Sequence, residues 1–173
     1  MSSFKKLKKI YKDYDTSIET KNGYDIFTIK NPHWNENITI DREIDDASGE
    51  LTVYFSFQHA HFSPDFPSEW YQEENKNYFE LAVEYINDFL HGKRVAVEFF
   101  IDGSSVFGGD ECRDEIDMLS GEEIFKRFAQ PYVEAMPPFN MSPYFERMKG
   151  YECRCSIRGW NDAHNKDLDF VVT

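Results

Sequence analysis

LTVYFSFQHAHF, residues 51–62, is the stretch that decides the fold. Apolar residues from Leu51 to Phe57 alternate along it with more polar residues from Thr52 to Gln58. Because successive side chains of a strand point to opposite faces, this alternation predicts a strand with one buried and one open face. We expect a single strand over 51–62, in which His59 and His61 continue the face of Phe57.

Further strands are predicted on both sides of this stretch. The pair Asn22-Gly23 favours the positive φ values of a tight hairpin turn. Strands are expected at residues 16–20, 24–30, 37–42, 94–102, 151–158 and 167–172, with a turn and a short strand within 103–109. Helical spacing predicts helices at residues 4–14, 73–91 and 120–129, the last opened by a capping-box pattern at Ser120. Four prolines predict an irregular segment over 130–143.

These elements indicate an α+β fold. The strands come in runs with occasional helices and without strict strand–helix–strand alternation, which favours antiparallel pairing. A chain of 173 residues is typical of one domain. We therefore expect a single domain over 1–173, with a predominantly antiparallel sheet of six to eight strands and the long 73–91 helix packed on one face.

The charge of the chain is strongly negative. The formal net charge is −13, although the first twelve residues carry five lysines and no acid. An acidic body repels phosphate backbones, so no nucleic-acid partner is expected, and it attracts basic proteins. The acids gather in two stretches: Asp110, Glu111, Asp114, Glu115 and Asp117, and then Asp41, Glu43, Asp45 and Asp46. The alternative is that these charges only keep the protein soluble.

The cysteines and the N-terminus point to the cytoplasm. The start lacks the apolar region of an export signal, and no apolar run is long enough to span a bilayer, so no membrane partner is expected. Three cysteines cannot form a closed disulfide framework, and reduced thiols are expected. Cys153 and Cys155 are interpreted as small buried apolar residues rather than zinc ligands.

His59 and His61 are the candidate metal ligands. They lie on the same side of a strand, so both imidazoles can reach one metal ion, with Asp65 and His33 as possible further ligands. Structural or polar-binding roles are the alternatives, because no second metal-binding motif follows. No nucleophile elbow, phosphate-binding loop or dinucleotide fingerprint occurs, so no catalytic residue and no cofactor are assigned.

Two tryptophans in predicted loops are candidate partner-binding anchors. Trp34 and Trp70 are of the residue type enriched at protein interfaces. Their alternative role is to fold back over the edge of the core. A third possibility is a small-ligand pocket between these two residues, near the end of the His59–His61 strand.

The segments NPHWNENITID and FSFQHAHF carry a resemblance. They resemble a group of small, acidic, uncharacterised bacterial domains, in which N-P and N-I precede a strand ending in H-x-H. In its acidic, aromatic-rich α+β character the chain is also similar to immunity proteins of bacterial polymorphic-toxin systems. The resemblance covers about 30 residues and implies no catalytic residues.

The sequence thus predicts a non-enzymatic, protein-binding domain, an immunity-type inhibitor of a basic partner. Its predicted partner-binding residues are the acidic stretch, defined as Asp110, Glu111, Asp114, Glu115 and Asp117, together with Trp34 and Trp70. A metal-dependent enzyme using His59 and His61, or a small-ligand module, is the alternative.

Overall fold

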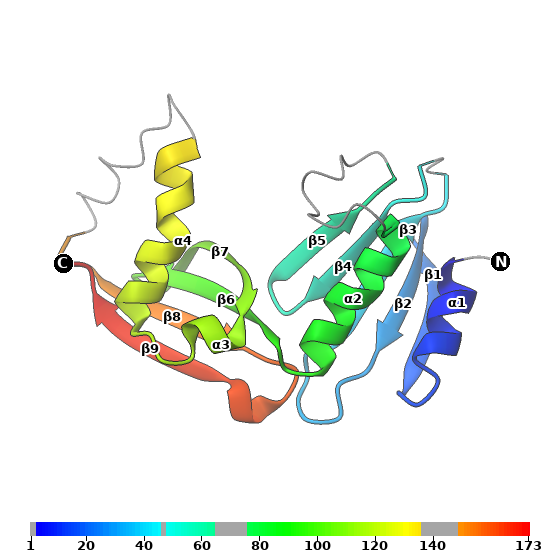
Figure 1. Ribbon diagram of the computed structural model, residues 1–173, viewed down its shortest axis with the longest axis horizontal. Coiled ribbons are helices and arrows are strands. Elements are labelled where there is room, and N and C mark those ends of the chain that lie inside the picture. The colour runs from blue at the N-terminus through cyan, green and yellow to red at the C-terminus, as the bar shows by residue number, and fades with distance from the viewer. Residues whose placement is uncertain (1–2, 46–47, 65–75, 136–148) are drawn as a thin grey trace. The chain divides into compact units, whose positions relative to one another are not determined.

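The computed structural model describes residues 3–45, 48–64, 76–135 and 149–173 (Figure 1). It divides into two compact units, Met1–His91 and Gly92–Thr173, each with its own sheet. All pairs of neighbouring strands are antiparallel. The α+β class and the antiparallel pairing are confirmed, while the single domain over 1–173 stays a prediction.

Unit 1 is a five-stranded meander with two helices. Its sheet has the order β1-β2-β3-β4-β5, so each strand pairs with the next along the chain. Asn22 and Gly23 have φ values of 53° and 86°, which confirms the predicted hairpin turn. The elements are α1 (Ser3–Ile10), β1 (Thr16–Lys21), β2 (Tyr24–Ile29), β3 (Ile38–Glu43), β4 (Leu51–Phe55), β5 (Gln58–Phe62) and α2 (Tyr78–Leu90).

Both helices of unit 1 pack on the same face of this sheet. The rings of Phe55 on β4 and Phe89 on α2 lie 4.8 Å apart, and Figure 1 shows α2 crossing the sheet. The ring of Phe4 on α1 lies 6.1 Å from that of Phe27 on β2. Tyr11, just after α1, donates a hydrogen bond of 3.2 Å from its hydroxyl to the Val83 carbonyl on α2. The core of unit 1 therefore lies between the sheet and its two helices.

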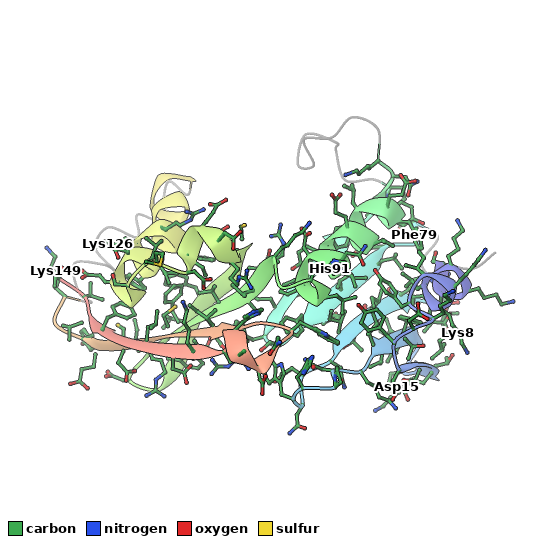
Figure 2. The ribbon with its side chains drawn as sticks, turned by 60° about the horizontal axis from the view of Figure 1, so that its bottom comes forward. Lys8, Asp15, Phe79, His91, Lys126 and Lys149 are labelled. Carbon is green, nitrogen blue, oxygen red and sulfur yellow. The ribbon has the colours of Figure 1, made fainter. Side chains whose placement is uncertain are left out.

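The lysines of α1 lie on its outer side. Phe4 and Leu7 are buried, whereas Lys5, Lys6 and Lys8 are exposed, and Lys8 extends outward in Figure 2. This amphipathic pattern is what the lysine-rich sequence predicts for a docked helix.

The predicted single strand over 51–62 is wrong. The structure turns at Ser56 and Phe57, and β4 and β5 form a hairpin in which Phe55 pairs with Gln58. Ser56 takes the left-handed conformation with φ 54°, although turns of this kind favour glycine or asparagine. Because the turn reverses the chain, His59 and His61 leave the face of Phe55 and point to the opposite side of the sheet.

The predicted single sheet with one long helix is also corrected. The strands form one sheet of five and one of four, and α2 has 13 residues. It begins after Asn77, whose side chain accepts hydrogen bonds from two backbone N–H groups while Glu80 accepts one from the Asn77 backbone. This capping box fixes the start of the helix. Residues 65–75, where the expected helix began, lie outside the described residues. Alternation predicts strands but not which strands pair, so the division into two sheets had no signal in the sequence.

Unit 2 is a four-stranded sheet with the order β7-β6-β8-β9. Phe99 on β6 is fully buried in its core, with ring centroids 4.9 Å from Phe107 on β7 and 5.3 Å from Phe125 on α4. The elements are β6 (Arg94–Ile101), β7 (Ser104–Cys112), α3 (Arg113–Ile116), α4 (Gly121–Ala135), β8 (Glu152–Arg158), the 3₁₀ helix η2 (Asp162–His164) and β9 (Lys166–Val171).

Helix α4 begins as predicted and ends later. Ser120 and Glu123 form the predicted capping box, with Glu123 accepting from the Ser120 backbone at 2.8 Å. The helix then continues through Pro131 to Ala135, within the segment predicted to be irregular. One proline removes one backbone hydrogen bond, and the buried Phe125 holds this helix on the sheet. Residues 136–148 lie outside the described residues.

The three cysteines are free, as predicted. Cys153 and Cys155 are buried on β8, and burial raises the pKa of the Cys155 thiol to about 12. No helix in the described part of the chain is both long and apolar enough to cross a membrane.

Candidate binding face

The face of the unit 1 sheet opposite α1 and α2 carries the candidate site. Cross-strand register sets its side chains in three rows, because directly paired residues lie on the same side of a sheet. We call these residues the open face. They are Glu19, Ile26, Asp41, Thr52 and His61 in one row, Ser17, Thr28, Thr39, Tyr54 and His59 in the next, and Lys21, Tyr24 and Glu43 at one end.

Asp41 lies at the centre of the open face. Its carboxylate accepts hydrogen bonds from the hydroxyls of Tyr54 and Thr52. Burial raises the pKa of Asp41 despite these hydrogen bonds. Burial and the charge of Asp41 both raise the pKa of Tyr54. The open face therefore holds a carboxylate in a partly desolvated position, which is a frequent property of binding and catalytic sites.

His59 and His61 lie next to this network, on the edge strand β5. The Nδ1 atom of His61 lies 2.6 Å from a carboxylate oxygen of Glu50 and 3.3 Å from the Thr52 hydroxyl. The two imidazole centroids are 5.1 Å apart, and the His59 ring stacks on Tyr54 at 5.6 Å. Within the described residues, no group of three or more histidines, cysteines or carboxylates is arranged to hold a metal ion.

The described residues do not group His33 with this pair. His33 is exposed in the loop after Pro32, where its backbone N–H donates to the Asn31 side chain at 2.9 Å. Asp65 lies outside the described residues. His59 and His61 are thus accompanied by Glu50 and Thr52, two residues that the sequence alone did not connect with them.

The open face carries three carboxylates that form no ion pair within the described part of the chain, although Lys21 lies on the same face. Glu19 and Glu43 are exposed, and Asp41 is half-buried. Among the described residues, none of these three carboxylates has a lysine or arginine within 4.0 Å. Asp25, by contrast, points to the helix side of the same sheet and pairs with Arg42 at 2.7 Å. An exposed aromatic residue, Tyr24, which is 39% accessible, adjoins these charges.

The acidic stretch differs from the open face in its charge balance. Each of its five carboxylates forms an ion pair within the chain, so the structure compensates its charge. Asp110 pairs with Arg94, Glu111 and Glu115 with Arg127, Asp114 with Arg113, and Asp117 with Arg113 and Lys166. Asp110 and Glu111 are neighbours on β7, so their side chains also point to opposite faces of the unit 2 sheet.

Trp34 does not lie on the open face. Trp34 is half-buried, and its ring meets that of Phe55 edge-on at a centroid distance of 6.2 Å. Phe55 lies on the helix side of the sheet. Trp70 lies outside the described residues. Trp160, which received no role from the sequence, is buried in unit 2 with 5% accessibility.

Unit 2 has a depression of about 850 Å³ on the side of its sheet that faces away from α4. Arg154 and Arg158 line it, but they already pair with Asp169 at 2.9 Å and Asp167 at 2.8 Å. Ser156 also donates to Asp167 at 2.7 Å. Both arginines of the depression are thus already paired with carboxylates, which makes it a weaker candidate for recognising an anionic ligand.

A scan against protein-family models and searches of curated proteins and of solved structures find no match to this chain. The functional assignment therefore depends on the geometry of the open face.

Proposed function

We propose that this chain is a non-enzymatic, cytoplasmic binding protein that docks a basic partner protein on the open face of unit 1, as an immunity-type inhibitor does. The observation that carries the proposal is the charge of this face. Glu19, Asp41 and Glu43 lie beside exposed aromatic rings and have no lysine or arginine in ion-pair distance within the described residues. A basic surface would supply the missing cations.

The two kinds of residue on the open face have different roles in this proposal. Carboxylates steer a basic partner and raise the association rate, an effect that salt weakens. Tyr24 and Tyr54 offer rigid rings that lose little conformational entropy on binding, and their burial sets the dissociation rate. Asp41 also fits a binding role. Partial burial disfavours the charged form of its carboxylate, and a cation bound beside it would stabilise that form.

The acidic stretch is the alternative docking surface. Judged from the sequence alone, its negative charge would attract a basic partner as well as that of the open face. Its arginine and lysine partners would have to leave their carboxylates before an incoming cation could pair with them, so less free energy is available for binding there. We therefore favour the open face.

Binding of the partner isolated from the source cell tests the proposal. The partner is captured at low salt on the full chain and identified by mass spectrometry, and association and dissociation rates are measured at two salt concentrations. In a Glu19→Gln/Asp41→Asn/Glu43→Gln variant we expect association at low salt to slow about tenfold. We expect Tyr54→Ala chiefly to speed dissociation, at a cost of about 1–2 kcal/mol.

A control variant removes the same number of charges elsewhere. Asp102, Glu152 and Asp162 are exposed residues of unit 2, and their amide replacements leave the open face unchanged. The control variant is expected to bind as wild type, as is a variant with all five carboxylates of the acidic stretch changed to amides. The proposal is wrong if no basic partner is recovered, or if the open-face variant binds at the wild-type rate at low salt.

A further inference from the structure

Strand β1 lies at one edge of the unit 1 sheet, with β2 as its one neighbour among the described strands. The Lys30 amide donates to the Asp15 carbonyl at 2.9 Å, and hydrogen-bonded pairs alternate along an antiparallel ladder. The register between β1 and β2 therefore directs the backbone N–H and C=O groups of Ser17, Glu19 and Lys21 toward β2. The backbone groups of the alternate residues point away from the sheet, and these residues are Thr16, Ile18 and Thr20.

The edge formed by β1 is open to a further strand. All its residues from Ser17 to Lys21 are exposed, and the apolar side chain of Ile18 is 46% accessible. Natural sheets protect their edges with prolines or with bulges, but β1 contains no proline and pairs with β2 in one continuous register. Its backbone groups are therefore available as a template on which another strand can pair.

The sequence of β1 is complementary to itself in one antiparallel register. Outward-facing residues pair with outward-facing residues, so Ile18 can lie opposite Ile18 of a second copy, with Thr16 opposite Thr20 on either side. The same register sets Lys21 of each copy opposite Asp15 of the other. Opposite charges in directly paired positions stabilise a strand pair, and two-fold symmetry gives this ion pair twice.

The other registers are less favourable. A shift of one residue would set outward-facing backbone groups against groups that already bond to β2. A shift of two residues sets Glu19 opposite either Glu19 or Asp15 of the second copy, and like charges in such positions repel. A shift of four residues pairs Glu19 with Lys21, but it carries each strand past the turn at Asn22, so fewer backbone groups are paired.

We propose that β1 is an interaction surface for a second copy of this chain, which adds its own β1 antiparallel in the register centred on Ile18. The three outward-facing positions of each copy then exchange about six hydrogen bonds. Asp15 already pairs with Lys30 of its own chain at 3.0 Å, but 70% of its side chain is accessible, so its carboxylate can also accept from Lys21 of the second copy. The inference goes beyond the proposed function and does not depend on it.

Sedimentation velocity of the full chain between about 10 µM and about 1 mM tests this pairing. One strand pair is a small interface, so we expect a reversible dimer with a dissociation constant of about 10–100 µM. Ile18→Pro removes the outward-facing N–H at the centre of the pairing and keeps the hydrogen bonds between β1 and β2, so it should weaken association at least about tenfold. Ile18→Val is the matched control, because it keeps this N–H, and it should dimerise as wild type.

An exchange of charges tests the register. Lys21→Glu sets like charges opposite each other at both ends of the strand pair and should weaken association at least about tenfold. Asp15→Lys in the same chain makes the paired charges opposite again and should restore the dimer. Circular dichroism shows that each variant is folded. A double variant that stays as weak as Lys21→Glu alone would overturn the register.

Hydrogen exchange of the wild-type amides, followed by nuclear magnetic resonance, requires no substitution. At a chain concentration of ten dissociation constants about a fifth of the chains are monomers, so the outward-facing amides should exchange about fivefold slower than in dilute solution. These amides belong to Thr16, Ile18 and Thr20. The amides of Ser17 and Glu19 already bond to β2, so they are internal controls and should change less.

Three results would each overturn self-pairing. They are a chain that stays monomeric at about 1 mM, an Ile18→Pro variant that dimerises as wild type, and edge amides that gain protection only when the basic partner is added, which would assign the edge to a strand of that partner. Partner binding is measured at about 1 µM chain, where the chain is monomeric. Failure of the dimer and failure of the proposed function are therefore distinguishable.

Discussion

Replacement of Phe99 by alanine should destabilise unit 2 and leave unit 1 intact. Phe99 is fully buried, and its ring contacts Phe107, Phe125 and Phe128 at centroid distances of 4.9, 5.3 and 5.7 Å. Truncation of such a buried phenylalanine costs about 3–5 kcal/mol, through lost burial and the cavity that remains. The hydrophobic cluster around Phe99 consists of residues between Val95 and Val172, so the loss falls on this unit.

Hydrogen exchange of the backbone amides measures this effect unit by unit. A loss of 3–5 kcal/mol corresponds to exchange about 10²–10⁴-fold faster for amides that open only when unit 2 unfolds. Amides of β6 and β8 should show this acceleration, and amides of β2 to β4 should keep their wild-type protection. Phe55→Ala, at a position 1% accessible in unit 1, is the reciprocal experiment and should give the opposite pattern.

Equal acceleration in both sheets after Phe99→Ala would refute this reasoning. The whole chain would then open as one cooperative unit, which is the behaviour of the single domain predicted from the sequence. A unit of this size has a total stability of only about 4–12 kcal/mol, so the alanine variant can lose unit 2 altogether. Phe99→Leu, with a cost of about 1–2 kcal/mol, retains the folded unit and gives the same comparison at smaller amplitude.

Three other predictions concern unit 2. Gly109→Ala should destabilise it by about 1–3 kcal/mol in urea unfolding, because the new Cβ would lie 2.6 Å from the ring of Phe128; Phe128→Leu in the same chain should recover part of the loss. Hydrogen bonds from Thr173 and Lys126 lower the pKa of Glu122 to about 2, so its contribution to stability is present above about pH 4.5 and is lost as the pH falls toward 2. Glu122→Gln should therefore make the free energy of unfolding fall less steeply as the pH is lowered below about 4.5, whereas Glu152→Gln should not. A thiol reagent at pH 8 should modify only Cys112 in the native protein and three cysteines after denaturation, since Cys153 and Cys155 are buried and burial raises the pKa of Cys155 to about 12.

Local signals in the sequence predicted local structure well. The turn at Asn22-Gly23 and the capping box at Ser120 depend on residues within four positions of each other, and the structure has both. The turn at Ser56-Phe57 was missed because neither residue is a usual residue of a two-residue hairpin. The alternation of apolar and more polar residues continues across this turn without interruption. The sequence pattern alone is therefore that of one long strand.

The charge balance of the acidic stretch depends on contacts that the sequence pattern does not contain. The acidic stretch is dense in the sequence, and although Arg113 lies within it, its other cationic partners come from distant positions. Arg127 lies 16 residues after Glu111, and Lys166 lies 49 residues after Asp117. Pairing over such separations is decided by tertiary packing, which a count of charges along the chain does not contain. The open face shows the reverse, since Glu19, Asp41 and Glu43 are scattered in the sequence and gathered by strand register.

The length of the turn between β4 and β5 determines what the open face contains. Side chains alternate along a strand, so a pairing shifted by one residue would exchange the two faces of β5. With Phe55 opposite Gln58, the apolar Phe62 lies toward α2, and its ring contacts Tyr85 at 5.4 Å. The same register sets His61 opposite Thr52, within reach of Glu50. A one-residue shift would bury both histidines and expose Phe62. Because burying two imidazoles and exposing a phenylalanine is unfavourable, the observed register is favoured. This register keeps the imidazoles beside Tyr54 and the carboxylates of the open face.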